Sequence, residues 1–570
     1  MNANELFSKL PKAEGDCRTR KYISPLRVVY QSGNVHGSEN MLESAAKTNK
    51  LFDSEKIQVH MNGSKCCVLD NSNGAKSSVI FDFGIEMHGA VRLIVKSVNP
   101  KRVNIRVRLG ESVMETMSDV TAESTATNDH ANRDFVWNVG FLSANETNES
   151  GFRFVKIDLL DDDARIEFQA VTGVLIYRDL EFKGSFECDD DLVNEIWRTS
   201  VHTTHMCMQE YLWDGIKRDR LVWIGDMQIE CLTIASVFGY NEIVPKSLDI
   251  IRDITPIGTW MNGMASYSLW WILIHYDWYL KFGSLEYLSE QSEYLLGLLD
   301  VVVGLVKDNG SENIPDGRFI DWPNQANPAA IHAGLHAMMI MALEAGAYLA
   351  SELSAVETVE KCNAAIAKLK TYIPEPAGSK QAASLLAYSG VEDAKKMDEE
   401  VISVGGVKGY STFLGYHTLA AKALAGNYEG ALAAMKEYWG GMLSLGATSF
   451  WEDFNIDWTE NAARIDEVTP EGKVDVHKAY GGYCYVGYRH SFCHGWASGP
   501  VPYITRYVLG IEILDPACKK IRIKPNMSGL KHIKATYPTP FGIVSIKLDL
   551  EADGSVRKEI VAPEEIEIVD

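Results

Sequence analysis

The chain has 570 residues, of which 46% are hydrophobic and 23% are charged, so it can bury a large core and lacks the composition of a disordered protein. The formal net charge of −22 argues against nucleic acid as a partner, because phosphate contacts need clusters of lysine and arginine. At roughly 100–200 residues per domain, the length predicts about two to four domains.

The N-terminal segment MNANELFSKLPKAEGDCRTRKY has no apolar run of the kind found in signal peptides. The ten cysteines are scattered, and the adjacent pair Cys66 and Cys67 belongs to no CxxC pattern. We therefore expect free thiols, a reducing compartment and a cytoplasmic location, although a leader lost from the sequence would leave the same pattern. Because no run of about 18 apolar residues occurs, we also expect no membrane span.

The first part of the chain has the pattern of β-structure. Five segments alternate or run apolar with β-branched residues: SSVIFDFG, AVRLIVKSV, RVNIRVRLG, FRFVKIDLL and ARIEFQAVTGVLIY. Turn-forming clusters such as SVNPKR and DLLDDDAR separate them. Short strands without helical spacers predict an N-terminal β-sandwich over residues 1–183.

Helical periodicity begins near Asp189 and continues for about 320 residues. After a first helix at that point, we expect helices near residues 223–238, 242–253, 265–281, 285–306, 328–352, 355–371, 380–389, 391–402, 412–425, 428–442 and 490–508. About twelve helices without intervening strands predict an (α/α)6 barrel over residues 184–510. An α-solenoid is the alternative, but no repeat of fixed period is evident.

After residue 510 the pattern returns to strands, in KKIRIKPN, KHIKATYPT and GIVSIKLDLEA. These predict a small C-terminal β domain over residues 511–570. A β-sandwich, a helical barrel and a β domain in series are typical of carbohydrate-active enzymes, which is an analogy at the level of the fold.

The segment DGIKRDRLVWIGD, residues 214–226, combines charges with tryptophan on a loop between the first two predicted helices. Asp214, Asp219 and Asp226 are suited to bind sugar hydroxyls or to supply an acid, and the intervening arginines are suited to hold these carboxylates. The alternative is a surface ion-pair network at a helix start.

A similar mixture of acid and aromatic residues recurs in GATSFWEDFNIDW, where Glu452 and Asp453 directly follow Trp451. In a barrel, loops distant in sequence converge. Two convergent carboxylates suit glycosidic cleavage, in which one protonates the leaving oxygen and the other activates water or attacks the sugar. The alternative is an ordinary helix-terminal carboxylate.

A third loop, GRFIDWPNQANPAAIHAGLH, pairs Asp321 with Trp322. His332 and His336 share a helix face, but HAGLH lacks the glutamate of HExxH and a third ligand. We therefore expect pocket-lining or core histidines and no metal. HTTH, at residues 202–205, is expected to serve helix packing.

The remaining candidates are His494 and Trp496, which precede the last predicted helix, and Trp260, at an expected loop tip. Glycines in SFCHGWASGP let the backbone pass close to a ligand, or simply mark a helix start. No phosphate loop, dinucleotide fingerprint or GxSxG motif is present, so no cofactor is expected.

These landmarks resemble the bacterial α-L-rhamnosidases of glycoside hydrolase family 78. FDFGIEMHGAVRL followed by VRLGESVME resembles the β-sandwich of that family, and GFRFVKIDL with YRDLEFKGSFECDDDLVNEIW resembles its entry into the barrel. DGIKRDRLVWIGD, IDWP, SFWEDF and SFCHGWASGP resemble its catalytic landmarks, so the resemblance covers most of the chain. It implies an inverting enzyme with an (α/α)6 barrel and two acidic catalytic residues.

The resemblance also implies residue roles. The first landmark resembles D-x-x-x-R-D-E-R-x-x-W-x-G-D, whose glutamate is the general acid. Here Arg218-Asp219-Arg220 is one residue shorter, and Asp219 is the nearest carboxylate and the candidate acid. Glu452 matches the general base. Together with the aromatic residues named above, the expected substrate-binding set is Asp214, Arg218, Trp223, Asp226, Trp260, Asp321, Trp322, Trp451, His494 and Trp496.

We therefore expect hydrolysis of terminal α-L-rhamnosyl or related deoxy-sugar residues, with a glycoside as partner and neither nucleic acid nor membrane. A homo-oligomer is left open. The alternatives are a different glycoside, a different acid such as Asp226, a sugar-binding relative that no longer cleaves, and a polysaccharide lyase. A lyase would use a Tyr or His base and give a product with a C4–C5 double bond.

Overall fold

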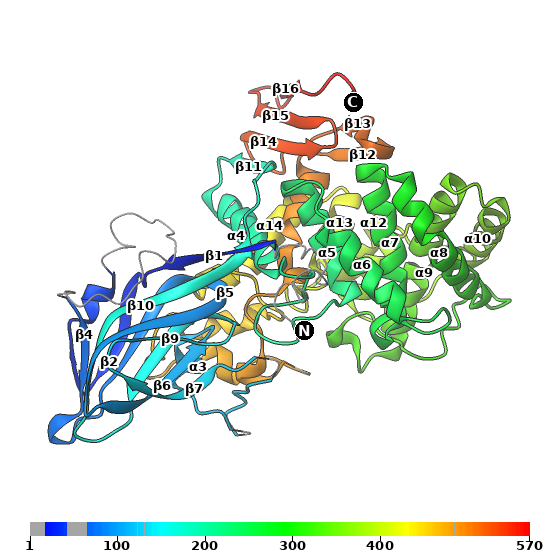
Figure 1. Cartoon of the computed structure of the whole chain (residues 1–570). Helices are drawn as coiled ribbons and strands as arrows, with labels where there is room; N and C mark the ends of the chain where they lie inside the picture. The colour runs from blue at the N-terminus through cyan, green and yellow to red at the C-terminus, as the bar shows by residue number, and fades with distance from the viewer. Residues whose placement is uncertain (1–16, 43–64, 122, 130, 484) are drawn as a thin grey trace, which may run out of the picture.

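The computed structural model describes residues 17–42 and 65–570, except residues 122, 130 and 484. A sheet-rich N-terminal region, a helical central region and C-terminal sheets follow one another along the chain (Figure 1). The expectation of no signal peptide concerns mainly residues 1–16, which lie outside the described residues. The described cysteines, including Cys66 and Cys67, are free thiols.

The N-terminal region is a sheet of ten strands, counted over the described residues. Its strands are β1 Arg18–Ile23, β2 Arg27–Ser32, β3 Asn34–His36, β4 Cys67–Asp70, β5 Ser78–Asn99, β6 Arg102–Gly110, β7 Asp134–Gly140, β8 Ser143–Glu146, β9 Ser150–Leu159 and β10 Arg165–Arg178. The order is β3-β4-β10-β5-β9-β6-β7, with β1 on β10 and with β2 and β8 on β5. The long strands β5 and β10 are antiparallel neighbours in this sheet, and a Cβ at Gly89 of β5 would lie 1.8 Å from the carbonyl oxygen of Val174 in β10.

The helices of the central region agree with the expected ones to within a few residues, up to residue 444. They are α4 Asp191–Cys207, α5 Ile224–Val237, α6 Ile243–Ile254, α7 Ala265–Phe282, α8 Leu285–Gly304, α9 Pro328–Glu352, α10 Val356–Leu369, α11 Lys380–Tyr388, α12 Ala394–Met397, α13 Gly415–Leu424 and α14 Tyr428–Ser444. Side chains of Asp190, Ser284, Asn327 and Asn427 cap the first turns of α4, α8, α9 and α14. These are the residue types that satisfy free N–H groups at a helix start.

Six of the described helices surround a common axis, because each touches the next: α5, α7, α9, α11, α13, α16 Pro500–Tyr503, and α5 again. The remaining helices pack outside them, α8 against α7 and α9, and α14 against α13 and α4. By length and composition α9 could cross a membrane, but 89% of its most apolar window is buried inside the protein. Packing within the core accounts for this apolar surface.

The expected helix over residues 490–508 is wrong in its first half. Only Pro500–Tyr503 and the π-helical turn Ile504–Val508 form a continuous helix there. The preceding backbone is bound elsewhere: the N–H of Phe492 donates to Glu111 at 2.7 Å, and that of His494 donates to the carbonyl oxygen of Phe450 at 3.0 Å. Tertiary hydrogen bonds therefore replace helical ones.

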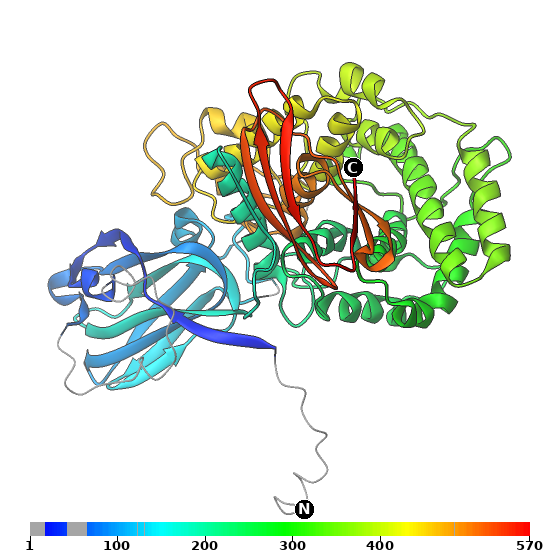
Figure 2. The same cartoon turned by 90° about the horizontal axis from the view of Figure 1, so that it is seen from above.

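Two C-terminal sheets lie over one end of the helices (Figure 2). Their strands are β12 Ile511–Asp515, β13 Lys520–Ile523 and β17 Glu567–Val569 in one sheet, and β11 Ser185–Cys188, β14 His532–Thr539, β15 Gly542–Leu550 and β16 Val556–Val561 in the other. Strand β11 belongs to sequence assigned to the helical region, yet it pairs with β14. The C-terminal sheet thus holds the start of the helical region.

Substituting Gly184 with alanine tests how tightly this junction is packed. A Cβ at Gly184 would lie 2.0 Å from the carbonyl oxygen of Ser236, which is backbone and cannot rotate away. We expect Gly184→Ala to destabilise the protein by about 1–3 kcal/mol, as overpacking does. The melting temperature should fall by several degrees in thermal unfolding. Gly304→Ala, where no atom lies within 4 Å, should leave it unchanged or slightly higher.

Candidate active site

The candidate residues gather at the N-terminal ends of the ring helices. Residues 208–223 connect α4 to α5, and Trp223 is the N-cap of α5. Asp321 precedes α9, Glu452 follows α14, and His494 precedes α16. Four loops far apart in the sequence therefore meet at one end of the helical region.

Arg218 joins two of the candidate carboxylates. Its Nη2 donates to Oε1 of Glu452, and its Nη1 lies 3.2 Å from Oδ1 of Asp219. Arg218 and Glu452 are almost fully buried, whereas the side chain of Asp219 keeps 18% of its surface exposed. The guanidinium therefore separates a buried carboxylate from a more accessible one.

Backbone contacts hold Glu452 in place. Its Oε2 accepts from the N–H of Ser491 at 3.3 Å, and its own N–H donates to the carbonyl oxygen of Ser491 at 3.0 Å. Its carbonyl oxygen accepts from Nε1 of Trp496 at 2.9 Å and from the hydroxyl of Thr412. The carboxylate has little freedom to move.

The imidazole of His494 lies among three carboxyl groups. Its Nε2 is 3.6 Å from Asp214 and 3.7 Å from Glu452, and its Nδ1 is 3.6 Å from Asp226. Burial lowers the pKa of His494 to about 4, despite the opposing effect of Glu452. Burial also raises the pKa of Asp214 to about 8, with Asp219 adding to the shift, and raises the pKa of Asp226 well above its usual value. The site therefore favours neutral forms of these groups at pH 7.

The geometry at Asp226 depends on its neighbour Gly225. The hydroxyl of Tyr267 donates to Oδ2 of Asp226 at 3.1 Å. A Cβ at Gly225 would lie 2.2 Å from the Tyr267 ring, so only glycine lets this ring pack against α5.

A second pair of acids lies beside Glu452. Burial raises the pKa of Asp321 to about 7, and Asp453 adds to the shift. Burial likewise raises the pKa of the half-buried Asp453 to about 7, with Glu452 as the next cause. Trp322 stacks on Tyr483 beyond Asp321, with ring centroids 5.9 Å apart and the rings inclined by 29°. This is the exposed aromatic edge of the site.

The loop that carries Asp219 is tightly turned. Asp219 and Arg220 have φ values of 55° and 54°, and the N–H of Arg220 donates to the carbonyl oxygen of Arg218 at 2.7 Å. Left-handed backbone at consecutive non-glycine residues is uncommon and concentrates at functional sites. Arg220 itself turns toward the ring of Trp213, 5.6 Å from its centroid.

The tryptophans expected to contact the sugar occupy different positions. Trp223 and Trp322 are half-buried at the site. Trp451 is fully buried, with its ring centroid 4.1 Å from that of Phe492, and Trp496 is buried with its Nε1 donating to the carbonyl oxygen of Glu452. The expected contact of Trp451 and Trp496 with a sugar stays a prediction.

Trp260 is half-buried on its loop, and its Nε1 donates to Asp316 at 2.7 Å. The turn Met261–Gly263 that follows Trp260 contacts the start of α5, since Oδ1 of Asn262 accepts from the N–H of Ile224 at 3.0 Å. Gly495 does not line a ligand space as expected, because a Cβ there would lie 1.7 Å from Oε1 of Glu230.

The sequence assigned no role to several residues of this site: Glu230, Tyr267, Asp453, Tyr483, His490 and Ser491. The ring of His490 belongs here because its Nε2 accepts from the N–H of Asp453 at 2.9 Å. Glu230 is fully buried and lies four residues after Asp226, one turn further along α5. This spacing was visible in the sequence, as was the position of Asp453 beside Glu452. Tyr267 comes from the first turn of α7, and the remaining residues come from loops, whose convergence no local pattern reveals.

The histidines outside the site take structural positions. His202 contacts the carbonyl oxygen of Glu86 at 2.8 Å, and His205 contacts that of Arg178 at 2.7 Å, so the HTTH segment packs α4 against the N-terminal sheet as expected. His332 contacts Glu312, and His336 is buried beside Tyr372.

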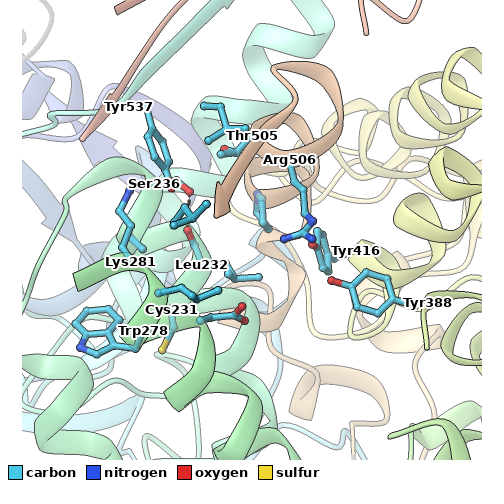
Figure 3. Close-up of a pocket in the computed structure, with 16 residues that line it drawn as sticks. Cys231, Leu232, Ser236, Trp278, Lys281, Tyr388, Tyr416, Thr505, Arg506 and Tyr537 are labelled. Carbon is cyan, nitrogen blue, oxygen red and sulfur yellow. Dashed lines mark hydrogen bonds between the residues drawn. The ribbon is translucent and has the colours of Figure 1, made fainter. Parts of the chain in front are cut away.

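A cavity of about 400 Å³ occupies the axis of the helical ring, with Gln228, Trp270, Tyr388, His417 and Arg506 among its walls. A smaller adjoining cavity of about 90 Å³ extends toward the C-terminal strands (Figure 3). The guanidinium of Arg506 points toward Tyr388 and Tyr416 there. The candidate site residues named above do not line either cavity.

Comparison with known proteins bears on the whole helical region. The family model of the bacterial α-L-rhamnosidase six-hairpin glycosidase domain matches residues 181–508. The structure of a family 78 rhamnosidase from Bacillus sp. GL1 is similar, with a TM-score of 0.73 at 19% identity over 91% of this chain and 55% of that one. An α-L-rhamnosidase from Dictyoglumus thermophilum has a TM-score of 0.66 at 19% identity over 88% and 57% of the two chains.

A rhamnosidase from Klebsiella oxytoca, solved with rhamnose bound, has a TM-score of 0.63 at 18% identity over 86% of this chain and 96% of that one. This chain thus spans little more than half of the first two structures. At these identities the likeness concerns the fold. No match was found among curated proteins.

The raised pKa of Asp214 predicts a pH-dependent stability difference. Its pKa is about 8 in the folded protein and about 3.9 when unfolded, so the native state holds a proton that the unfolded state releases. The contribution of Asp214 to the free energy of unfolding is therefore present at pH 4. It is lost as pH rises toward 8, because ionisation increasingly favours the unfolded state. Asparagine cannot ionise. We therefore expect the melting temperature of Asp214→Asn minus that of wild type to rise by several degrees from pH 4 to pH 8.

The comparison with wild type at each pH removes the effects of other titrating groups, including His494. Glu195→Gln, at an exposed position of α4, is the control and should follow the wild-type curve. A constant difference between Asp214→Asn and wild type across this range would contradict the assigned protonation.

Proposed function

We infer the reaction from the family: the chain belongs to the bacterial α-L-rhamnosidase six-hairpin glycosidase family and is a glycoside hydrolase. We propose that it releases terminal α-L-rhamnosyl or related deoxy-sugar residues. The observation that carries this proposal is the Arg218 guanidinium between Asp219 and Glu452, within a family match that spans the loops bearing all three.

In the proposed mechanism Asp219 protonates the glycosidic oxygen and Glu452 draws a proton from water that attacks the opposite face of the sugar. The greater exposure of Asp219 suits a group that meets the leaving group. The separation of the two carboxylates by a guanidinium favours inversion, which needs about 6.5–9.5 Å between them to admit a water. Burial raises the pKa of Asp214 to about 8, so at neutral pH this carboxyl holds a proton and can donate a hydrogen bond to a sugar hydroxyl.

The remaining side chains would bind the sugar. Asp321 and Asp226 offer buried carboxyl groups to hydroxyls, and Trp322 and Trp223 offer half-buried rings to the apolar face of a deoxy sugar. We also propose that the ring of helices is an (α/α)6 barrel over residues 184–510 and that the N-terminal sheet is a β-sandwich. The closed sequence of contacts from α5 to α16 supports the barrel.

The two catalytic roles predict different responses to the leaving group. p-Nitrophenolate leaves with little protonation, whereas a sugar alcohol needs the acid. We expect Glu452→Gln to lower kcat by about 10²–10⁴-fold on both p-nitrophenyl α-L-rhamnoside and a rhamnosyl disaccharide. Asp219→Asn should lose about that much on the disaccharide and clearly less on the aryl glycoside. Initial-rate assays of wild type and both variants measure this contrast.

Glu460→Gln, which removes an exposed carboxyl eight residues after Glu452 in the sequence, is the control and should keep wild-type rates. Proton NMR of the first product should show the β-anomer, as inversion requires. Full activity of Glu452→Gln would remove Glu452 from the mechanism. If wild type releases no sugar from a panel of aryl glycosides, binding heat in calorimetry with oligosaccharides would indicate a sugar-binding protein. Absorbance from a C4–C5 double bond in the product would indicate a lyase.

A further inference from the structure

A buried lysine joins the loop of Arg218 to the N-terminal region. The side chain of Lys217 is 1% exposed, and its Nζ lies 3.2 Å from Oε2 of Glu111 and 3.0 Å from Oε1 of Glu115. Both glutamates belong to the segment that runs from β6 into α3, Val113–Met117. An ammonium so far from water requires such partners, because burying an unpaired charge is strongly unfavourable.

The lysine also completes a group of side chains that resembles a metal site. Ligand atoms of Glu111, Glu115 and His477 lie within 4.8 Å of one another. The Nζ of Lys217 is 3.1 Å from Nε2 of His477 and also contacts both glutamates. The ammonium of Lys217 therefore occupies the place that a cation would take. Its positive charge balances the negative charge of the two glutamates, and it comes from the loop that also carries Arg218, here called the catalytic loop.

The same cluster reaches Glu452 by a second route. Oε2 of Glu111 accepts from the N–H of Phe492 at 2.7 Å. The preceding residue, Ser491, donates its N–H to Glu452. The residue after Lys217 is Arg218, the other donor to Glu452. Each of these two donors to the carboxylate is thus one residue away from a contact with Glu111.

Strand β9 supports the loop from the same side. A Cβ at Gly151 would lie 2.8 Å from the backbone nitrogen of Lys217 and 2.8 Å from the carbonyl carbon of Ile216. The N-terminal sheet therefore packs directly against the backbone of the catalytic loop. The buried ion pairs of Lys217 with Glu111 and Glu115 fix the position of the loop against the sheet.

We propose that Lys217 and Glu111 are positioning residues through which the N-terminal region holds Arg218 and Ser491 against Glu452. The N-terminal region thereby completes the active site instead of serving as a separate module. This inference rests on the proposed function, in which Glu452 is the general base.

Removing the lysine should leave a folded protein. Arg133 also pairs with Glu115, so that pair keeps its charge balance when Lys217 becomes methionine. Burial raises the pKa of Glu111 to about 7, so this carboxyl can take up a proton when its partner is lost. Methionine fills a similar volume in the cavity that remains.

The test compares kcat and KM of Lys217→Met, Glu111→Leu and Glu111→Gln with wild type on p-nitrophenyl α-L-rhamnoside. Because a displacement of about 1 Å costs about 10²-fold in rate, we expect kcat of Lys217→Met and Glu111→Leu to fall by about 10²-fold. KM should change by less than about threefold. Glu111→Gln keeps an oxygen acceptor for the N–H of Phe492 and should recover most of the kcat lost in Glu111→Leu.

Lys156→Met is the matched control, because it breaks a largely buried lysine–carboxylate pair, with Asp158, that lies on β9 away from the catalytic loop. It should lower the melting temperature without changing kcat. Folded Lys217→Met and Glu111→Leu with kcat within twofold of wild type would overturn the proposal, as would equal losses in the two Glu111 variants.

Hydrogen exchange separates this proposal from the proposed function. Lys217→Met should exchange faster than wild type and Lys156→Met in the backbone of residues 214–222 and 490–496, even if wild type cleaves no glycoside. An inactive wild type with this exchange pattern would reject the function and keep the positioning role. Unchanged exchange would reject the positioning role. If Lys217→Met does not fold, the two Glu111 variants carry the same test.

Discussion

The contact between Arg218 and Glu452 is the interaction on which the site depends. One guanidinium binds the carboxylate of Glu452, approaches Asp219, and donates to the carbonyl oxygen of Arg489 at 3.0 Å. Three loops therefore meet at a single side chain. A planar guanidinium with five donors can do this, whereas a lysine ammonium would offer no comparable fixed geometry.

Burial of so many charges has a consequence for protonation. The site holds more carboxyl groups than cations, and little of it contacts water. The protein responds by neutralising groups: the pKa of Asp214 rises to about 8, while that of His494 falls to about 4. Carboxyl groups that hold a proton at pH 7 can donate hydrogen bonds to sugar oxygens, which ionised ones cannot. Desolvation, more than any single ion pair, decides which groups are donors.

The ring of helices places different chemistry at its two ends. At the end where α5 and α7 begin, carboxyl groups converge from loops. At the other end, the cavity beside Arg506 is walled by tyrosines and closed by the C-terminal strands. The N-terminal sheet contacts the end of the ring where these loops lie, and the C-terminal sheets contact the opposite end. Each β region therefore packs against one end of the helical region.

The sequence by itself determined the succession of sheet, helices and sheet, because periodicity and caps such as Asp190 and Asn327 are local signals. It also determined which loops carry acids beside aromatic residues. Only the tertiary structure decided that Trp451 stacks on Phe492 beneath the site, that residues 490–494 are not helical, and that β11 joins the C-terminal sheet. It alone joined Lys217 to Glu111, because contacts between residues about 100 positions apart depend on how separate elements pack and leave no periodic trace in the chain.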